Sequence, residues 1–119
     1  MDFPEDQITE LRDFGNVATG QEGTTQYLII EQLQLPEGCT PGKCDTLLCP
    51  VKANGYNSKL YFAERVRGIG ADQRNWHGDA TFRILERNWY SFSWQLSDGS
   101  SNLRLAQILA LHLKPLRSE

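Results

Sequence analysis

The sequence has no long hydrophobic run and no excess of positive charge, and these two absences exclude large classes of protein. Its longest uncharged apolar runs, such as residues 27–30, are far shorter than the ~20 residues that a membrane-spanning helix needs. Lysine and arginine total 12 against 15 aspartates and glutamates, and the net charge of -3 argues against a nucleic-acid partner. The acidic opening, residues 1–6, is unlike a secretory leader, so we expect a cytoplasmic protein that binds no membrane.

Cysteine is scarce and confined to one region. The sequence has only Cys39, Cys44 and Cys49, and an odd number of cysteines in a cytoplasmic chain is typical of reduced thiols. Zinc ligands usually lie roughly two to four residues apart in two pairs, which is not the spacing found here. His77 completes four ligands only on paper, so we expect no metal and no cofactor. Cys49, which follows two leucines, is interpreted as a small core residue.

The hydrophobic patterns predict one domain over residues 1–119, because no repeat, low-complexity tract or long linker divides the chain. Helices are predicted where apolar residues recur on one face, over residues 4–14 and 103–113. Segments rich in β-branched and aromatic residues predict four strands, over residues 24–35, 45–51, 58–66 and 80–85. Four consecutive strands between two helices predict an α+β domain built on a four-stranded antiparallel meander.

Glycine, proline and asparagine predict the connections. Residues 20–23 and the glycine-rich residues 68–78 are predicted to be surface loops. Asn54 and Gly55 form a hairpin-type turn signal, and residues 98–102 offer caps for the last helix. His112 lies on the apolar side of that helix and is predicted to be a hydrogen-bonded histidine at the edge of the core.

Several short motifs follow one another in the middle of the chain. They are Leu35-Pro36-Glu37-Gly38, the segment from Cys44 to Pro50, Gly55-Tyr56-Asn57, Leu60-Tyr61-Phe62 and the aromatic block 89–94. In this order they resemble the bacterial branch of the ubiquitin-conjugating enzyme (UBC) superfamily, over roughly residues 25 to 113. The resemblance implies a UBC-like fold and a role in bacterial ubiquitin-like modification, a pathway type linked to antiviral defence. It also implies two partners, a ubiquitin-like protein and a ThiF-type activating enzyme.

The chain departs from that family at two points. Tyr56-Asn57 stands where the family has Tyr-Pro, and no cysteine follows Cys49, although conjugating enzymes place their catalytic cysteine after the fourth strand. Three hypotheses follow. The protein is a non-catalytic scaffold for the activating enzyme, or a serine carries the ubiquitin-like C-terminus as an oxyester, or a partner supplies the cysteine.

Ser91 and Ser93 lie in the stretch where the resemblance implies the acyl carrier, and they are the predicted nucleophiles. A serine hydroxyl is a weak nucleophile without an adjacent base. His77 stands where the family carries a His-Pro-Asn motif, with Gly78 and Asp79 in place of the last two residues, and it is the predicted base. The alternative is that the two serines are small packing residues and that His77 is a loop histidine without a catalytic role.

Large aromatic residues are the candidates for partner binding. Tryptophan is enriched at interface hot spots and is also common in cores, so an exposed member of the set would bind a partner and a buried one would not. The predicted partner-binding residues are Tyr56, Trp76, Trp89 and Trp94. A loose basic stretch would suit an acidic partner surface, or would simply be solvated; it comprises Arg65, Arg67, Arg74, Arg83 and Arg87. The competing function is a small protein-binding or immunity-type module without any role in conjugation.

Overall fold

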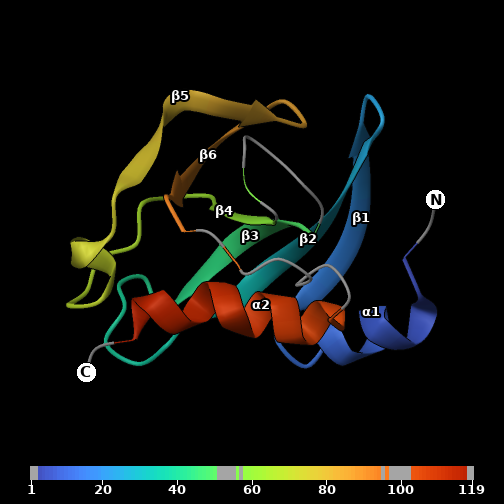
Figure 1. Cartoon of the computed structure of the whole chain (residues 1–119), viewed down its shortest axis with the longest axis horizontal. Helices are drawn as coiled ribbons and strands as arrows, with labels where there is room; N and C mark the ends of the chain where they lie inside the picture. Colours follow the sequence, from blue (N-terminus) through green and yellow to red (C-terminus); the bar gives the residue numbers. More distant parts are fainter. Residues whose placement is uncertain (1–2, 51–55, 57, 95, 97–102, 118–119) are drawn as a thin grey trace.

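The computed structural model describes residues 3–50, 56, 58–94, 96 and 103–117 of the 119-residue chain (Figure 1). Two α-helices lie near the ends of the chain, α1 (Glu5–Leu11) and α2 (Leu105–Leu113). Between them run the strands β1 (Asn16–Glu22), β2 (Thr25–Gln34), β3 (Lys43–Cys49), β4 (Lys59–Phe62), β5 (Trp76–Ile84) and β6 (Arg87–Phe92). Two short 3-10 helices complete the described elements, η1 (Ala71–Gln73) and η3 (Lys114–Leu116).

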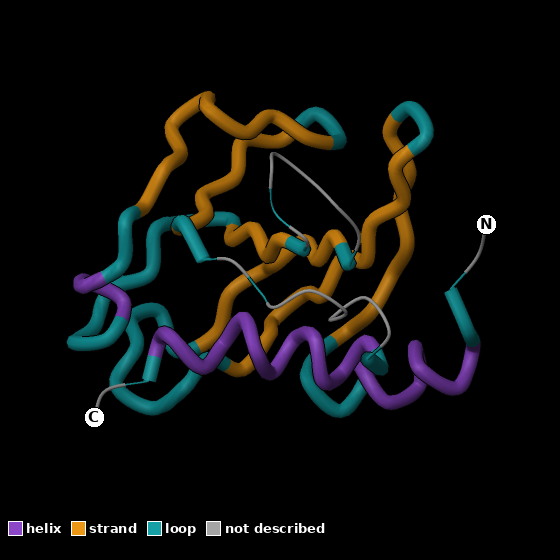
Figure 2. Tube along the Cα trace, viewed as in Figure 1, coloured by secondary structure: helices purple, strands orange, loops and turns teal. Residues whose placement is uncertain are grey.

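The described strands form one antiparallel sheet in the order β1-β2-β3-β4-β6-β5. The predicted UBC-like α+β fold with a four-stranded meander is therefore wrong: the domain is mostly sheet, and its described residues form a six-stranded sheet and two short α-helices. The helices lie along one side of the sheet (Figure 2). Both terminal helices lie where the apolar periodicity predicted them, and each is shorter than predicted.

Two strands extend into segments that were predicted to be loops. β1 pairs with β2 along its whole length, from Asn16 opposite Glu31 to Glu22 opposite Thr25. Its burial does not alternate cleanly, so no period of two identifies it in the sequence. β5 begins at Trp76, inside the predicted loop, because this segment pairs with the aromatic strand β6. In both cases hydrogen bonding to a neighbouring strand outweighs a local glycine content that is typical of loops.

The sheet is covered on both faces. On one face α1 and α2 pack over a core that includes Leu28, Ile30 and Phe62. On the other face a second cluster, with Tyr61 and Trp89 at its centre, lies beneath the β5–β6 hairpin, which folds back over the sheet (Figure 1). The hairpin tips meet where the backbone N–H of Leu85 donates to a Glu22 carboxylate oxygen at 3.0 Å. Residues 46–49 of β3 and all of β4 are buried on both faces as a result.

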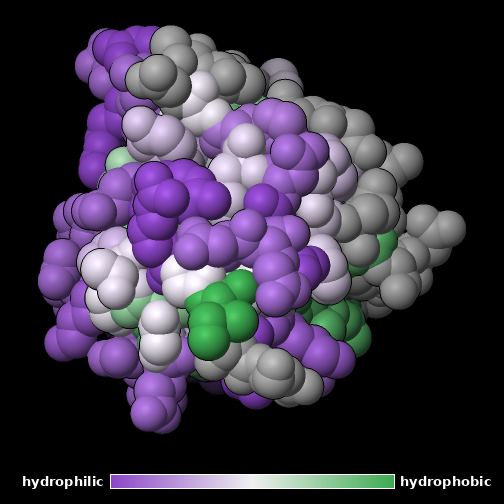
Figure 3. Space-filling view, turned by 90° about the vertical axis from the view of Figure 1, so that its left-hand side faces the viewer, coloured by the Kyte–Doolittle hydropathy of each residue, from purple (hydrophilic) through white to green (hydrophobic). Residues whose placement is uncertain are grey.

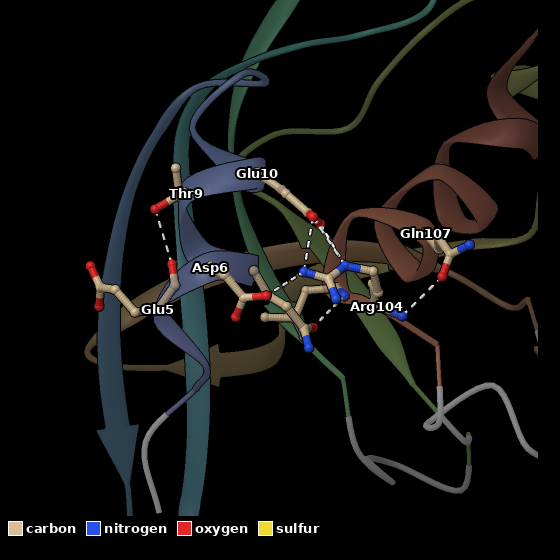
Figure 4. A network of polar contacts seen from close by, with 8 residues as sticks. Glu5, Asp6, Thr9, Glu10, Arg104 and Gln107 are labelled. Carbon is tan, nitrogen blue, oxygen red and sulfur yellow. Dashed lines mark hydrogen bonds and ion pairs between the residues drawn. The ribbon is translucent and has the colours of Figure 1, made fainter.

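A network of polar contacts holds α1 against the start of α2 (Figure 4). The Arg104 guanidinium donates through Nε to both Glu10 carboxylate oxygens at 3.0 Å and through Nη2 to Asp6 at 2.6 Å. The Leu105 N–H donates to the Gln7 side-chain oxygen at 2.9 Å. The Arg104 hydrogen bond lowers the pKa of Asp6 below its ordinary value. These contacts join α1 to the N-terminal end of α2.

Some predicted features lie outside the described residues, namely the hairpin turn at Asn54 and Gly55 and the helix caps in residues 98–102. No helix in the described part of the chain is long and apolar enough to cross a membrane.

Candidate functional site

The β5–β6 pairing brings the predicted base to one of the predicted nucleophiles. His77 pairs with Ser91 in the register, which makes Ser93 its diagonal neighbour on the same face. His77 Nε2 lies 3.1 Å from Ser93 Oγ, within hydrogen-bond distance. His77 is exposed and Ser93 is half-buried, so water reaches this pair. The geometry is that of a base next to a hydroxyl nucleophile.

Ser91, the other predicted nucleophile, has a different environment. Its side chain is 1% exposed, and its hydroxyl donates to the Leu60 carbonyl at 2.7 Å. This hydrogen bond joins β6 to β4. Among the described residues, β4 and β6 share one register pair, Phe62 opposite Tyr90. Ser91 therefore stabilises the β4–β6 junction, and its burial makes it unsuited to nucleophilic attack.

Lys59 supplies a second side-chain bond across the same junction and was not singled out from the sequence. Its amine is buried, donates to the Phe92 carbonyl at 3.1 Å and lies 4.0 Å from the centre of the Tyr56 ring. Burial lowers the pKa of Lys59 to about 8. The period of two in β4 places Lys59 on the same face as Tyr61, which was the available signal for its burial. Tyr56, a predicted partner-binding residue, instead packs its half-buried ring on this amine.

His112 and Ser58 form a buried pair below the sheet. His112 Nε2 lies 2.9 Å from Ser58 Oγ, and the Ser58 hydroxyl donates its one hydrogen to the Cys49 carbonyl at 2.8 Å. The Nε2–H of His112 is therefore the donor to Ser58. Burial, with a smaller contribution from the positive charge of Lys59, lowers the pKa of His112 to about 4. The ring is 2% exposed and neutral at pH 7, so it is hydrogen-bonded, as predicted, but lies inside the core and not at its edge.

The three tryptophans divide between core and surface. Trp89 is 1% exposed and donates its indole N–H to the Ile84 carbonyl at 2.9 Å, so it stabilises the core and has no surface for a partner. Trp76 is half-buried against Phe62, and its indole N–H donates to the Ala71 carbonyl at 2.7 Å. Trp94 is half-buried, with the Arg74 guanidinium 5.3 Å from its ring. Both partly exposed rings already have neighbours within the chain.

The five arginines of the basic stretch do not form one surface. Arg65 forms an ion pair with Asp72 beside η1, whereas Arg83 bonds to Asn88 on the β5–β6 hairpin. The end of the molecule that carries η1 is mostly hydrophilic, with a limited hydrophobic area (Figure 3). Ile69 lies in the loop before η1 and is 67% exposed. Arg65 and Arg83 therefore serve local contacts at separate places in the fold.

None of the three cysteines takes part in a disulfide. Cys44 and Cys49 are buried, as predicted for Cys49, and Cys39 is half-buried. Burial raises the pKa of the Cys39 and Cys44 thiols, which keeps them protonated near neutral pH. In the described part of the chain, no group of three or more histidine, cysteine, aspartate or glutamate side chains could hold a metal ion.

The two edges of the sheet differ in how they are protected. At one edge, the pairing of β5 with β6 shifts register between His77 and Phe82, which marks an irregularity of the bulge type. At the other edge, β1 is seven residues long, contains no proline, lysine or arginine and pairs with β2 without any shift. No described strand pairs with its outer side. Natural proteins usually blunt such an edge with lysine, proline or a bulge. The one charged residue of β1, Glu22, stands at its end and accepts the Leu85 N–H, so the unprotected β1 edge indicates a binding surface.

The hydrogen-bonding groups of this edge follow from the turn. Glu22 and Thr25 flank a two-residue turn and form a hydrogen-bonded pair, so the even-numbered residues of β1 bond to β2. The N–H and C=O groups of Val17, Thr19 and Gln21 therefore point outward. Beside them lies an open groove of about 510 Å³, lined by Phe3, Glu5, Ile8, Thr19, Gly20, Gln21 and Gln26.

Comparisons of the chain with protein-family models, with curated proteins and with solved structures find no match. The resemblance to conjugating enzymes stays a prediction.

Proposed function

We propose that this protein is a protein-binding module that takes up an extended segment of a partner along the outer edge of β1. The observation that carries the proposal is the unprotected edge of β1 beside a groove walled by α1. In strand addition of this kind, backbone hydrogen bonds supply affinity and a pocket for alternate side chains supplies specificity. The module needs no catalytic residue, as in the competing function stated above.

The groove indicates which partner segment fits. Val17 packs against the helix-side core, so the odd-numbered side chains of β1 and the alternate side chains of an added strand face α1. Phe3 and Ile8 give that side an apolar wall, and Glu5 adds a negative charge at its rim. We expect a segment with apolar residues at alternate positions and a basic residue near Glu5.

A pair of substitutions at Thr19 tests the proposal. Thr19→Pro removes an outward N–H without removing a bond to β2, whereas Thr19→Val keeps the N–H and a similar side-chain volume. Random peptides of about twelve residues, displayed on phage, are selected on the natural protein and titrated against both variants by calorimetry. We expect Thr19→Pro to weaken binding about tenfold or more and Thr19→Val to change it less than about twofold.

Two results would contradict strand addition at β1. One is a selection that enriches no peptide, and the other is a set of peptides that bind Thr19→Pro as tightly as Thr19→Val. Thermal unfolding of both variants is measured alongside, so that a loss of binding is not confused with a loss of folding.

A second candidate function rests on the 3.1 Å contact between His77 and Ser93. In it, Ser93 Oγ attacks the adenylated C-terminus of a ubiquitin-like protein, His77 Nε2 accepts the hydroxyl proton, and AMP leaves as the ester forms. Purified protein is mixed with a ubiquitin-like protein, a ThiF-type activating enzyme and ATP. A base-labile adduct that is lost in Ser93→Ala and kept in Ser91→Ala supports this candidate, and the absence of an adduct refutes it. Co-elution with the activating enzyme without an adduct supports a scaffold.

A further inference from the structure

We infer that, when no partner is present, a second copy of this chain occupies the β1 edge, paired antiparallel about a twofold axis at Thr19. The inference uses the same edge as the proposed function and rests on its being open for pairing, but it does not require that a partner protein exists. Three features of β1 carry it: the register of its outward groups, the match of its side chains and the position of the groove.

The register of the outward groups allows the chain to pair with itself. An antiparallel ladder requires that outward-pointing residues of one strand lie opposite outward-pointing residues of the other. A twofold axis at Thr19 places Thr19 opposite its own copy and Val17 opposite Gln21, and all of these residues point outward. Thr19 is also the midpoint of β1 (Asn16–Glu22), so this register overlaps the two strands completely and forms about six backbone hydrogen bonds.

The side chains that meet in this register are compatible. On the helix side, Thr19 faces its own copy, a cross-strand pair that is favourable in sheets. On the opposite side, Ala18 faces Gly20, which Leu85 of its own copy already covers, so this pair adds neither bulk nor charge to the contact. At the ends, Glu22 faces Asn16 of the other copy, so no like charges are placed opposite each other.

The groove lies where Val17 of the second copy would fit. Val17 is the one aliphatic residue of β1 that is larger than alanine. In the paired register, Val17 of each copy lies opposite Gln21 of the other, on the side that faces α1. Gln21 and Thr19 line the groove together with Phe3 and Ile8. Val17 of the second copy therefore lies beside Phe3 and Ile8, the two apolar side chains of an otherwise polar groove, and part of its surface loses contact with water. Because the axis is twofold, the same contact forms twice.

The contact area sets the expected affinity. A stable dimer buries roughly 800 Å² on each partner, and a single seven-residue edge buries less, so we expect a dissociation constant on the order of 100 μM. Each copy carries a net charge of -3, and the two copies repel each other at long range. Added salt screens this repulsion, so dimerisation strengthens between low and moderate ionic strength.

Sedimentation equilibrium tests the inference on the full chain without any ligand. The natural protein and Thr19→Val are expected to dimerise as concentration rises to about 1 mM, and Thr19→Pro is expected to stay monomeric. Amide hydrogen exchange of the natural protein at low and high concentration supplies an independent measurement. Protection of the Val17, Thr19 and Gln21 amides rises with concentration if the inference is right.

Two outcomes overturn it: a natural protein that is monomeric at about 1 mM, and a dimer that persists in Thr19→Pro and therefore uses another surface. Peptide titrations at about 10 μM, far below the expected dissociation constant, separate this inference from the proposed function. Peptide binding without a dimer refutes the inference alone, and a dimer without peptide binding refutes the proposed function alone.

Discussion

The buried His112 gives a sharp prediction about acid stability. Its pKa is about 4 in the folded protein and 6.5 in an exposed histidine, so the unfolded chain binds more protons between these two values. The contribution of His112 to the free energy of unfolding is therefore complete above pH 6.5 and is lost as pH falls towards 4. The difference of about 2.5 units corresponds to a loss of about 2 kcal/mol at pH 5 and about 3 kcal/mol at pH 4.

The perturbation is His112→Gln, which removes the titrating group and keeps an N–H donor that can reach Ser58. Urea unfolding, followed by tryptophan fluorescence, is measured for both proteins between pH 7 and pH 4.5. We expect the free energy of unfolding of the natural protein to fall by about 2 kcal/mol more than that of the variant between pH 7 and pH 5. The carboxylates are common to both proteins, and their effects cancel in the difference.

His77→Gln provides the matched control, because it removes the exposed histidine and leaves the Ser58–His112 pair intact. This variant should keep the acid sensitivity of the natural protein. If His112→Gln and the natural protein lose stability in parallel between pH 7 and pH 5, the neutral buried histidine is refuted.

Three further predictions concern the sheet. Lys59 has a pKa of about 8 in the folded protein and 10.5 when exposed, so its contribution to the free energy of unfolding rises between these two pH values. Lys59→Met should remove this rise in urea unfolding measured at pH 8 and pH 10.5, and an unchanged rise would contradict a buried amine. Ser91→Ala leaves the buried Leu60 carbonyl unpaired and should lower the free energy of unfolding by about 1–3 kcal/mol, more than Ser93→Ala does in the same assay. A side chain at Gly15 would overlap the Glu31 carbonyl, so Gly15→Ala should lower the free energy of unfolding by about 1–3 kcal/mol in a chemical unfolding assay. In Gly42→Ala the added methyl group meets no atom, and the free energy of unfolding should change by less than about 0.5 kcal/mol.

The candidate site was partly readable from the chain. Residue type and the family resemblance predict Ser93 and His77, and the β5–β6 register brings their side chains together. The same grounds predict Ser91. The sequence does not show that β4 lies beside β6, or that the Leu60 carbonyl in β4 accepts a hydrogen bond from the Ser91 hydroxyl. Lys59 was missed because lysine is ordinarily a surface residue, whereas β4 is buried on both faces.

The unprotected β1 edge was missed for a different reason. Residues 16–22 bury little on either face, so they carry no hydrophobic period, and Gly20 is typical of a loop. Only the pairing with β2 makes the segment a strand, and only the position of β1 at the end of the sheet leaves its outer groups unpaired by any described strand.

Patterns within a few residues were sufficient to place both helices, the central strands β2, β3 and β4, and the burial of Cys49 and His112. These features depend on periodicity and side-chain size, which neighbouring residues carry themselves. The order of the strands, the fold of the β5–β6 hairpin over the second core, and the contrast between a blunted edge and an open one depend on segments far apart in the chain. Their free energy comes from pairing and packing between those segments, and no short stretch of sequence contains it.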